Sequence, residues 1–310
     1  MIRGTVQAMR IAIVGLGKMG GNMAERLLGK GHTVDVYDVS AEARGRLVAK
    51  GAKELTTLEA LAALPGPRVV WVMVPAGEIT EHVLHTIYEI LSAGDIVIEG
   101  GNSRYTESQT RSAHFAGKNI QMLDAGTSGG VWGLQNGYCL MVGGPRAAYD
   151  HVLPLLTDLA GPEALAYLGT SGAGHYAKMV HNGIEYAMMQ SYAEGFELLK
   201  AGDFGYDLGQ IAALWNHGSV VRSWLLELTE RALKEDASLD KVAPYVTDSG
   251  EGRWTVEEGV RRAVALPTIA AALFARFNSR NERGFGLRLL SALRNQFGGH
   301  AVQSTKGGTP

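Results

Sequence analysis

The chain has 310 residues, of which 46% are hydrophobic and 19% are charged, and its formal net charge at pH 7 is -2. This composition excludes an intrinsically disordered chain and a general nucleic-acid binder, because the first needs a low hydrophobic content and the second a basic surface. A chain of this length exceeds what one hydrophobic core usually serves. We therefore expect two domains and a small-molecule ligand.

The cysteine count and the hydropathy pattern bear on location. Cys139 is the single cysteine, and it can form neither an internal disulfide nor a multi-thiol zinc site, which favours a reducing compartment. Residues 1–10 lack the apolar run of a secretory signal, and no stretch reaches the roughly 18 uninterrupted apolar residues of a membrane span. We expect a cytoplasmic protein with no membrane partner, in which residues 1–8 form a frayed extension.

From Arg10 to Gly169, short runs of β-branched residues alternate with stretches of helical periodicity. The runs are RIAIVG (10–15), TVDVYD (33–38), RVVWVMVP (68–75), DIVIEG (95–100), QMLDAG (121–126) and YCLMVGG (138–144). Such alternation predicts a mostly parallel sheet covered by helices, the α/β class. We expect residues 1–169 to form a doubly wound, Rossmann-type dinucleotide-binding domain.

The first run leads into a glycine-rich loop with the spacing GxGxxG, followed by a helical stretch. The loop consists of Gly15, Leu16, Gly17, Lys18, Met19 and Gly20. Between a strand and a helix, the first glycine allows a tight turn, the second lets the backbone approach a pyrophosphate, and the third lets helix and strand pack closely. The loop therefore predicts a dinucleotide with its phosphates at the helix N-terminus. The alternative is a glycine turn without a ligand.

Asp38 ends the second run, 23 positions after Gly15. A carboxylate at this place can bind the adenosine ribose hydroxyls, and it repels a 2′-phosphate. We therefore expect NAD to be preferred over NADP. Arg44 and Arg46 follow downstream, and they keep NADP open as the alternative cofactor.

After about Thr170 the pattern changes to long stretches of helical periodicity. The stretches are 174–201, 208–233 and 256–278, with a break at the DSGEG of 248–252 and at other turns that contain glycine or proline. We expect residues 170–310 to form an all-helical domain for substrate binding and oligomerisation. The tail, 298–310, has little to bury and is expected to be disordered unless another surface orders it.

The segment GAGHYAKMVHNGIEY (172–186) carries four polar residues at helical spacing. Lys178, His181, Asn182 and Glu185 lie at i, i+3, i+4 and i+7, which places them on one stripe of a helix. The stripe is flanked by the apolar residues Met179, Val180, Ile184, Ala187 and Met188. This pattern indicates an apolar helix with a polar stripe inside it, an acid/base pair beside two hydrogen-bonding groups. The alternative is a solvated face with a Lys/Glu pair.

Several motifs occur together in one order. They are GLGKMG (15–20), VMVPAG (72–77), GGNS (100–103), DAGTSGGVWG (124–133) and KMVHNGIEY (178–186). With these motifs the chain resembles the β-hydroxyacid dehydrogenase superfamily and, within it, the 6-phosphogluconate dehydrogenases. The lysine helix with its HN pair and following glutamate is specific to the phosphogluconate branch. The chain resembles the short form, because the long form has a duplicated helical half.

The resemblance implies an NAD-dependent oxidative decarboxylation of 6-phosphogluconate to ribulose 5-phosphate, a reaction of the pentose phosphate pathway. It makes Lys178 the general base at the C3 hydroxyl and Glu185 the acid that protonates C1 of the enediol. A lysine acts as a base only when it is partly neutral, and a carboxyl acts as an acid only when burial keeps it protonated. No metal is required.

The resemblance also assigns binding residues. Substrate contacts are expected from Asn102, Ser128, Gly129, Gly130, His181, Asn182, Tyr186, Arg276, Arg294 and His300, the last four at the phosphate. Val74 and Asn102 join the glycine-rich loop and Asp38 at the cofactor. The family's tail motif, matched by Arg294 and His300, reaches into a neighbouring subunit's site, which implies a homo-oligomer, a dimer or a tetramer. For each single arginine, a solvated surface charge is the alternative.

One departure from the family and two other functions stay open. The loop 248–254 is shorter than in the long form, whose substrate-binding lysine and threonine are absent here, and Arg253 is the candidate replacement for the lost charge. A dehydrogenase of another β-hydroxy acid, such as 3-hydroxyisobutyrate, would not need the cluster of Arg276, Arg294 and His300. A non-catalytic dinucleotide-binding sensor would have no chemical need for Lys178.

Overall fold

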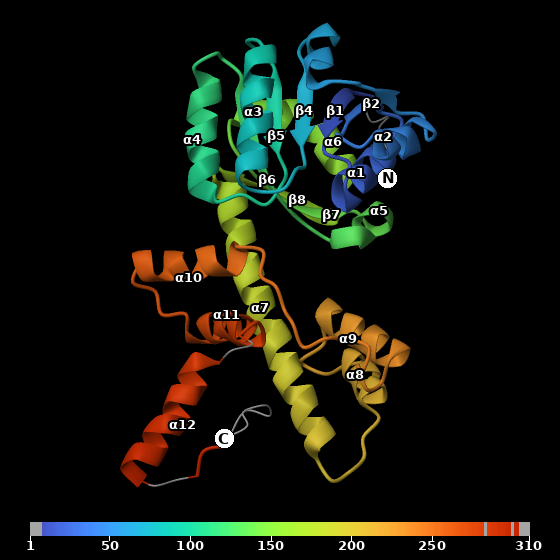
Figure 1. The fold of residues 1–310 in the computed structure, drawn as a ribbon. Coiled ribbons are helices and arrows are strands. Elements are labelled where there is room, and N and C mark those ends of the chain that lie inside the picture. The colour runs from blue at the N-terminus through green and yellow to red at the C-terminus, as the bar shows by residue number, and fades with distance from the viewer. Residues whose placement is uncertain (1–7, 282–283, 299–300, 304–310) are drawn as a thin grey trace. The chain divides into compact units, whose positions relative to one another are not determined.

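The structure is a computed structural model that describes residues 8–281, 284–298 and 301–303 (Figure 1). It divides into two compact units, Met1–Gly183 and Ile184–Pro310. The first strand begins at Arg10 as predicted, whereas the frayed extension expected at the N-terminus lies outside the described residues except for Ala8. In the described ranges, no helix combines the length and the hydropathy that a membrane span requires.

The first unit is built on a sheet whose described part has eight strands in the order β3-β2-β1-β4-β5-β6-β7-β8. The strands are β1 Arg10–Val14, β2 Thr33–Tyr37, β3 Lys53–Glu54, β4 Val69–Val72, β5 Ile96–Glu99, β6 Gln121–Ser128, β7 Tyr138–Gly143 and β8 Ala160–Gly169. All neighbours pair in parallel except β6 and β7, which are antiparallel. The prediction of a mostly parallel, doubly wound sheet is confirmed.

Helices cover both faces of this sheet (Figure 1). They are α1 Lys18–Gly29, α2 Ala41–Val48, η1 Leu58–Ala63, α3 Glu78–Ile90, α4 Tyr105–Ala116, η2 Gly130–Trp132, α5 Gly133–Asn136 and α6 Arg146–Leu159. One core packs α1, α2 and α6 on one face, and a second core packs η1, α3 and α4 on the other. Val70 and Trp71 are adjacent in β4 and belong to opposite cores. Burial on both faces explains why the strands read as continuous apolar runs.

Two strands were not predicted, β3 and β8. The first has only two residues. The second begins at Ala160 and continues with Gly161 and Pro162, and Glu163 has a positive φ of 57°. This combination is typical of a turn. Because β8 lies at the edge of the sheet and pairs with β7 alone, a proline there costs no hydrogen bond to a second neighbour.

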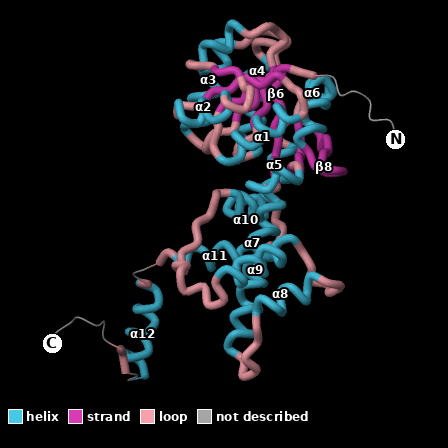
Figure 2. Tube along the Cα trace, turned by 90° about the vertical axis from the view of Figure 1, so that its right-hand side faces the viewer, coloured by secondary structure: helices cyan, strands magenta, loops and turns pink. Residues whose placement is uncertain are grey.

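The described residues of the second unit form helices and loops (Figure 2), as predicted. The helices are α7 Ala173–Ala201, which begins in the first unit, α8 Leu208–Asn216, α9 Trp224–Glu235, α10 Glu251–Arg261, α11 Pro267–Ser279 and α12 Phe285–Gly298. One core joins Phe196 of α7 to α8 and α9, and another joins Tyr186 of α7 to α11. The division between units falls inside α7, after Gly183, so the predicted boundary between 169 and 170 stays a prediction.

Two of the predicted helical stretches are interrupted. The stretch 208–233 breaks at 217–223, where Gly218 has a positive φ and the side chain of Ser223 caps α9 by accepting from the backbone N–H of Leu226 at 3.1 Å. The stretch 256–278 breaks at 262–266, and Pro267 then opens α11, a position that proline favours. Side-chain periodicity continues across both breaks, which is why it did not reveal them.

Candidate active site

The glycine-rich loop has the geometry that its spacing predicts. Gly15 has a φ of +94°, and a Cβ on it would lie 2.4 Å from the carbonyl oxygen of Met73. A Cβ on Gly20 would lie 2.0 Å from the carbonyl oxygen of Gly15, whereas nothing lies within 4 Å of the position for Gly17. The outer glycines are therefore needed for the turn and for packing, and the middle one leaves the backbone open. This cradle fits the pyrophosphate of a dinucleotide.

Three loops meet at the carboxyl end of the sheet beside β1. This strand pairs with β2 on one side and β4 on the other, so the order of strands in the sheet reverses at β1. Ligands of α/β sheets bind at such points of reversal. A Cβ on Gly101 would lie 2.8 Å from the carbonyl oxygen of Val74. The loop after β5, which carries the exposed Asn102, therefore lies against the loop after β4, and two predicted cofactor residues come from adjoining segments.

The carboxylate of Asp38 is engaged with the backbone. One oxygen accepts a hydrogen bond from the N–H of Leu16 at 2.7 Å, and the other accepts one from the N–H of Ser40 at 2.8 Å. Arg44 donates to the carbonyl oxygen of Asp38 and pairs with Glu54, and the exposed Arg46 donates to the carbonyl oxygen of Leu16. Asp38 thus fixes the glycine-rich loop, a role that the sequence did not suggest.

Helix α7 begins directly on the backbone of β6. A Cβ on Gly126 would lie 2.5 Å from the Cβ of Lys178, and a Cβ on Gly174 would lie 2.6 Å from the carbonyl oxygen of Asp124. The carboxylate of Asp124 accepts from the N–H groups of Gly172 and His175 at 2.7 and 2.9 Å, which satisfies donors that a helix start leaves open. Lys178 is only 7% exposed and is held against the strand.

The end of β6 meets the polar stripe of α7. The hydroxyl of Ser128 lies 3.4 Å from Nε2 of His181, and Nδ1 of His181 lies 3.0 Å from Oδ1 of Asn182. Gly129 and Gly130 follow Ser128 with positive φ values of 125° and 53°, which turn the chain away from the strand. The fold thus brings together five of the predicted substrate residues and the predicted base.

The burial of α7 differs from one half of the stripe to the other. Lys178 and Asn182 are buried and Glu185 is half-buried, so the alternative of a fully solvated face is wrong. The expected apolar surroundings are only partly present, because Met179 is buried while Ile184 and Met188 are 50% and 37% exposed. The change coincides with the end of the first unit at Gly183.

Two of the four residues predicted at the phosphate lie in contact. The guanidinium of Arg276 stacks 3.4 Å from the ring centroid of Tyr186 and donates to the carbonyl oxygen of Thr247 at 2.9 Å. The phenol oxygen of Tyr186 accepts from the N–H of Ser249 at 3.0 Å. Arg294 lies on α12 and is exposed. His300 lies outside the described residues.

The shortened loop holds two more guanidinium groups through one carboxylate. Asp248 accepts from Arg253 at 2.8 and 3.0 Å and from Arg280 at 2.8 Å. The hydrogen bond from Arg253, aided by that from Arg280, lowers the pKa of Asp248 to about 2 against the opposing effect of burial. The charge predicted to replace the missing lysine is thus already paired within the loop.

A group of buried residues behind the site was not predicted. Glu99, Ser108, Arg111 and His175 form a connected network, and Asp124 holds the start of α7. Two signals were present in the sequence. A carboxylate directly precedes GGNS, and a histidine lies one helical turn before Lys178. Neither signal showed that the partners of these residues come from α4, because that pairing depends on the fold.

Comparison with known proteins gives the family. Residues 10–169 match the family model described as the NAD binding domain of 6-phosphogluconate dehydrogenase, and residues 174–285 match that of its C-terminal domain. The chain belongs to the 6-phosphogluconate dehydrogenase family. It is therefore an oxidoreductase that binds NAD or NADP, as the glycine-rich loop predicted.

Relatives of similar length fall within the same family. YqeC of Bacillus subtilis, which carries the 6-phosphogluconate dehydrogenase name provisionally, is 46% identical over 296 residues that cover 95% of this chain and 99% of that protein. A Haloferax volcanii protein named as the NAD(+)-dependent, decarboxylating enzyme is 43% identical over 297 residues, covering 95% and 98%. The Lactococcus lactis enzyme (strain IL1403) is 34% identical, and the chain spans 65% of that protein.

Solved structures agree with this placement. The 6-phosphogluconate dehydrogenase of Plasmodium falciparum, studied without ligands, with NADP+ and with 6-phosphogluconate, superposes with a TM-score of 0.80 at 29% identity, covering 97% of this chain and 67% of that one. A 3-hydroxyisobutyrate dehydrogenase from Salmonella typhimurium reaches a TM-score of 0.76 at 23% identity, covering 89% and 95%. The second likeness shows a shared fold.

Proposed function

We propose that the protein catalyses the oxidative decarboxylation of 6-phosphogluconate to ribulose 5-phosphate and CO2. The observation that carries the proposal is the buried Lys178, packed against Gly126 beside the Ser128–His181–Asn182 group. Burial of an amine costs free energy, and a buried lysine beside groups that can hold a substrate is well placed for acid/base chemistry. The names of the Haloferax volcanii and Plasmodium falciparum relatives point to the same reaction.

The residues of α7 would handle the protons of this reaction. Lys178, in its neutral form, would take the proton of the C3 hydroxyl. A nicotinamide cofactor held by the glycine-rich loop would supply the hydride acceptor for this oxidation. The resulting ammonium then stabilises the enolate that forms as CO2 leaves. Glu185 lies seven positions further along the same helix and, in its protonated form, delivers a proton to C1 of the enediol. His181 and Asn182 hold hydroxyl oxygens of the sugar acid.

The two ends of the substrate would be bound by different groups. Ser128 and the backbone of Gly129 and Gly130 would hold the carboxylate. Arg276, stacked on Tyr186 and aligned by Thr247, would bind the phosphate, for which a guanidinium has the right shape and charge. A non-phosphorylated β-hydroxy acid would leave this arginine without a function.

We also propose that NAD is preferred over NADP. The carboxylate of Asp38 lies at the end of β2 beside the glycine-rich loop, where it would repel a 2′-phosphate. Arg44, the nearer of the two arginines in sequence, is paired with Glu54 at 2.8 Å. The NAD(+)-dependent relative supports this preference, and the NADP+ complex of the Plasmodium falciparum enzyme supports the alternative.

A substrate panel tests the proposed function. The purified protein is mixed with NAD or NADP and with 6-phosphogluconate, gluconate or 3-hydroxyisobutyrate, and both the absorbance of the reduced cofactor and the released CO2 are recorded. We expect reduction and CO2 in equal amounts with 6-phosphogluconate, and little turnover of gluconate. Faster turnover of 3-hydroxyisobutyrate would instead establish the other β-hydroxy acid function. No turnover of any of the three would favour the sensor.

A further inference from the structure

A buried chain of hydrogen bonds links the end of β5 to the start of α7 through α4. The hydroxyl of Ser108 donates to Oε2 of Glu99 at 2.9 Å and lies 2.8 Å from Nδ1 of His175. All three residues are buried, and Glu99 is only 1% exposed. The mechanism proposed above uses none of them.

The proton count along this chain fixes the direction of each bond. Glu99 is a carboxylate paired with Arg111, so it can only accept. Ser108 has a single proton and gives it to Glu99, and its oxygen must therefore accept from the N–H at Nδ1 of His175. Nε2 of His175 has no hydrogen-bond partner within the part of the chain that the structure describes. Among the described residues, the imidazole of His175 thus makes one hydrogen bond, in which Nδ1 donates to the hydroxyl oxygen of Ser108.

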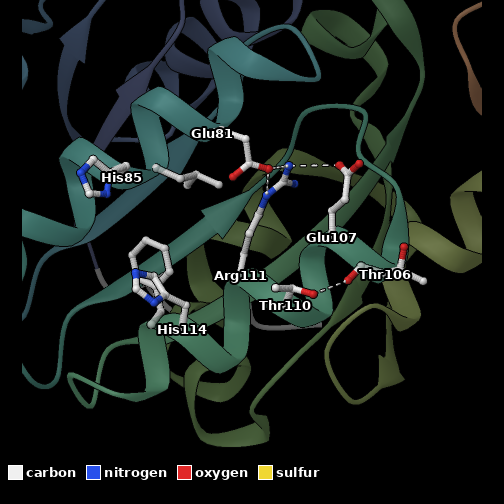
Figure 3. A pocket seen from close by; sticks show the side chains of 9 residues that line it. Glu81, His85, Thr106, Glu107, Thr110, Arg111 and His114 are labelled. Atoms are coloured by element: carbon white, nitrogen blue, oxygen red, sulfur yellow. Dashed lines mark hydrogen bonds and ion pairs between the residues drawn. The ribbon is translucent and has the colours of Figure 1, made fainter.

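The outer end of the network is anchored by Arg111, which pairs with Glu99 and, as Figure 3 shows, also points toward Glu81 and Glu107. Its guanidinium reaches Glu81 and Glu107 at the wall of a cavity of about 410 Å³ between α3 and α4. These two carboxylates are 59% and 45% exposed, so they hold the arginine only weakly. Burial lowers the pKa of Arg111, but the charge of Glu99, followed by the hydrogen bond to Glu81 and the charges of Glu81 and Glu107, raises it above the ordinary value. Glu99 is therefore the partner that fixes the cation.

The network connects both sides of the proposed reaction site. Glu99 is the last residue of β5, three positions before Asn102. Arg111 also donates to the hydroxyl of Ser103, one position after Asn102, at 3.1 Å. At the other end, His175 precedes Lys178 by one helical turn. One buried network thus holds the loop that carries Asn102 and the helix that carries the predicted base.

We propose that His175 is a positioning residue for the dehydrogenase reaction. Its hydrogen bond to Ser108 sets the rotation and height of the first turns of α7 relative to the loop after β5, and thereby the place of the Lys178 amine relative to the reacting C3. This inference rests on the proposed function for its kinetic consequence. Its structural consequence, the position of Lys178, does not depend on which substrate the enzyme uses.

Variants of His175 separate the hydrogen bond from the mere presence of a side chain. His175→Asn places an amide N–H near the position of Nδ1 and should retain the bond to Ser108, whereas His175→Gln places its amide near Nε2 and should not. His175→Leu and Ser108→Ala remove the bond from either side. Ser112→Ala is the matched control, because Ser112 lies one turn further on α4 and bonds Ser171 at 2.8 Å without joining the network.

We expect kcat with 6-phosphogluconate to fall by roughly 10–100-fold in His175→Leu, His175→Gln and Ser108→Ala, since small misplacements of reacting groups have effects of this size. The kcat of His175→Asn and that of Ser112→Ala should stay within about threefold of the wild-type value. The Michaelis constant for NAD should be unchanged in all five variants, and retained NAD binding shows that the first unit is folded. The double variant of Ser108→Ala with His175→Leu should be no slower than the worse single variant.

Crystal structures of the wild type and His175→Gln complete the test. We expect the Cβ of Lys178 to shift relative to the Cα of Gly126 in the variant. Equal activity of the Asn and Gln variants would overturn the proposal, and so would an unmoved Lys178. If the wild type proves inactive on 6-phosphogluconate, the proposed function fails, while the crystallographic comparison still decides the positioning role.

Discussion

At the scale of single residues, the site depends on side chains whose burial and contacts select one role. Lys178 is buried against a glycine, Gly126. Glu185 is half-buried on the same helix. The two groups proposed to exchange protons at different carbons therefore differ in burial.

Substitutions at these two residues should affect different steps. Lys178→Met removes the base and should reduce both oxidation and decarboxylation by at least the ~10²–10⁴-fold typical of acid/base groups. Glu185→Gln should retain more of the oxidation and slow the final protonation of C1. Single-turnover measurement of reduced cofactor and of ribulose 5-phosphate separates the two steps. Near-normal turnover in Lys178→Met would contradict the mechanism.

Asp38 should determine the choice of cofactor. Asp38→Ala removes the charge that repels a 2′-phosphate and also the bond to the N–H of Leu16, so kcat/KM for NAD should fall by roughly 10-fold or more, the size expected for bonds to a charged group. The ratio of kcat/KM for NADP to that for NAD should rise. Ser40→Ala is the control, because its hydroxyl caps α2 through Ala43. A wild type that uses NADP better than NAD would refute this interpretation of Asp38.

At the scale of elements, the loop between α9 and α10 orders several side chains of the second unit. Thr247 aligns Arg276, Asp248 holds Arg253 and Arg280, and Ser249 binds Tyr186. A single short segment thus sets the place of the residues proposed at the phosphate. A compact ionic cluster of Asp248, Arg253 and Arg280 holds this loop.

This cluster predicts a pH dependence of stability. The pKa of Asp248 is about 2, below its ordinary 3.8, so the folded state favours the carboxylate. The stabilisation is fully present above about pH 4 and is lost as the pH falls toward 2. Asp248→Asn should lower the free energy of unfolding at pH 7 by on the order of 1–2 kcal/mol, a value discounted because Arg253 is half-exposed.

Urea unfolding at pH 7, 4 and 3 measures this effect. The difference between the wild type and Asp248→Asn should shrink as the pH falls. Asp150→Asn removes an exposed pair with Arg146 on α6 and should cost less than about 0.5 kcal/mol at pH 7. A difference for Asp248→Asn that stays constant from pH 7 to 3 would show that its carboxylate does not contribute through its charge.

At the scale of the whole molecule, the last described helix has many exposed apolar side chains. Phe285, Leu287, Leu290 and Leu293 of α12 are all about half or more exposed. Because an uncovered apolar helix is unfavourable in water, a second copy of the chain is the occupant that fits the predicted homo-oligomer. Arg294 lies on the same helix and would be carried to the neighbouring site.

A hybrid oligomer tests whether sites are shared between chains. Arg294→Ala should raise the Michaelis constant for 6-phosphogluconate by roughly 10-fold, the size expected for a charge-assisted bond, while NAD binding stays unchanged. Truncation after Asn295 removes His300 and should act in the same direction. Subunits with Lys178→Met are then mixed with subunits with Arg294→Ala, so that some sites contain neither change. No recovery of activity in verified hybrids would place the tail in its own subunit's site or outside any site.

The sequence by itself determined the fold class and the dinucleotide-binding loop. Strands buried on both faces read as apolar runs, the glycine-rich loop demands its turn, and the polar stripe of α7 follows from helical spacing alone, because each of these is a local pattern. The sequence did not predict the edge strand β8, because its first residues suggest a turn. It also did not predict the breaks at 217–223 and 262–266, because helical periodicity continues across them.

Only the tertiary structure decided which distant residues share one environment. Asp38 binds Leu16, Asp124 holds the start of α7, and Ser108 joins Glu99 to His175. Each of these contacts crosses between elements, and its partner is chosen by the order of strands in the sheet. Hydrogen-bond partners far apart in sequence leave no periodic signal, so the chemistry of Lys178 could be predicted from its helix, but not the network that positions it.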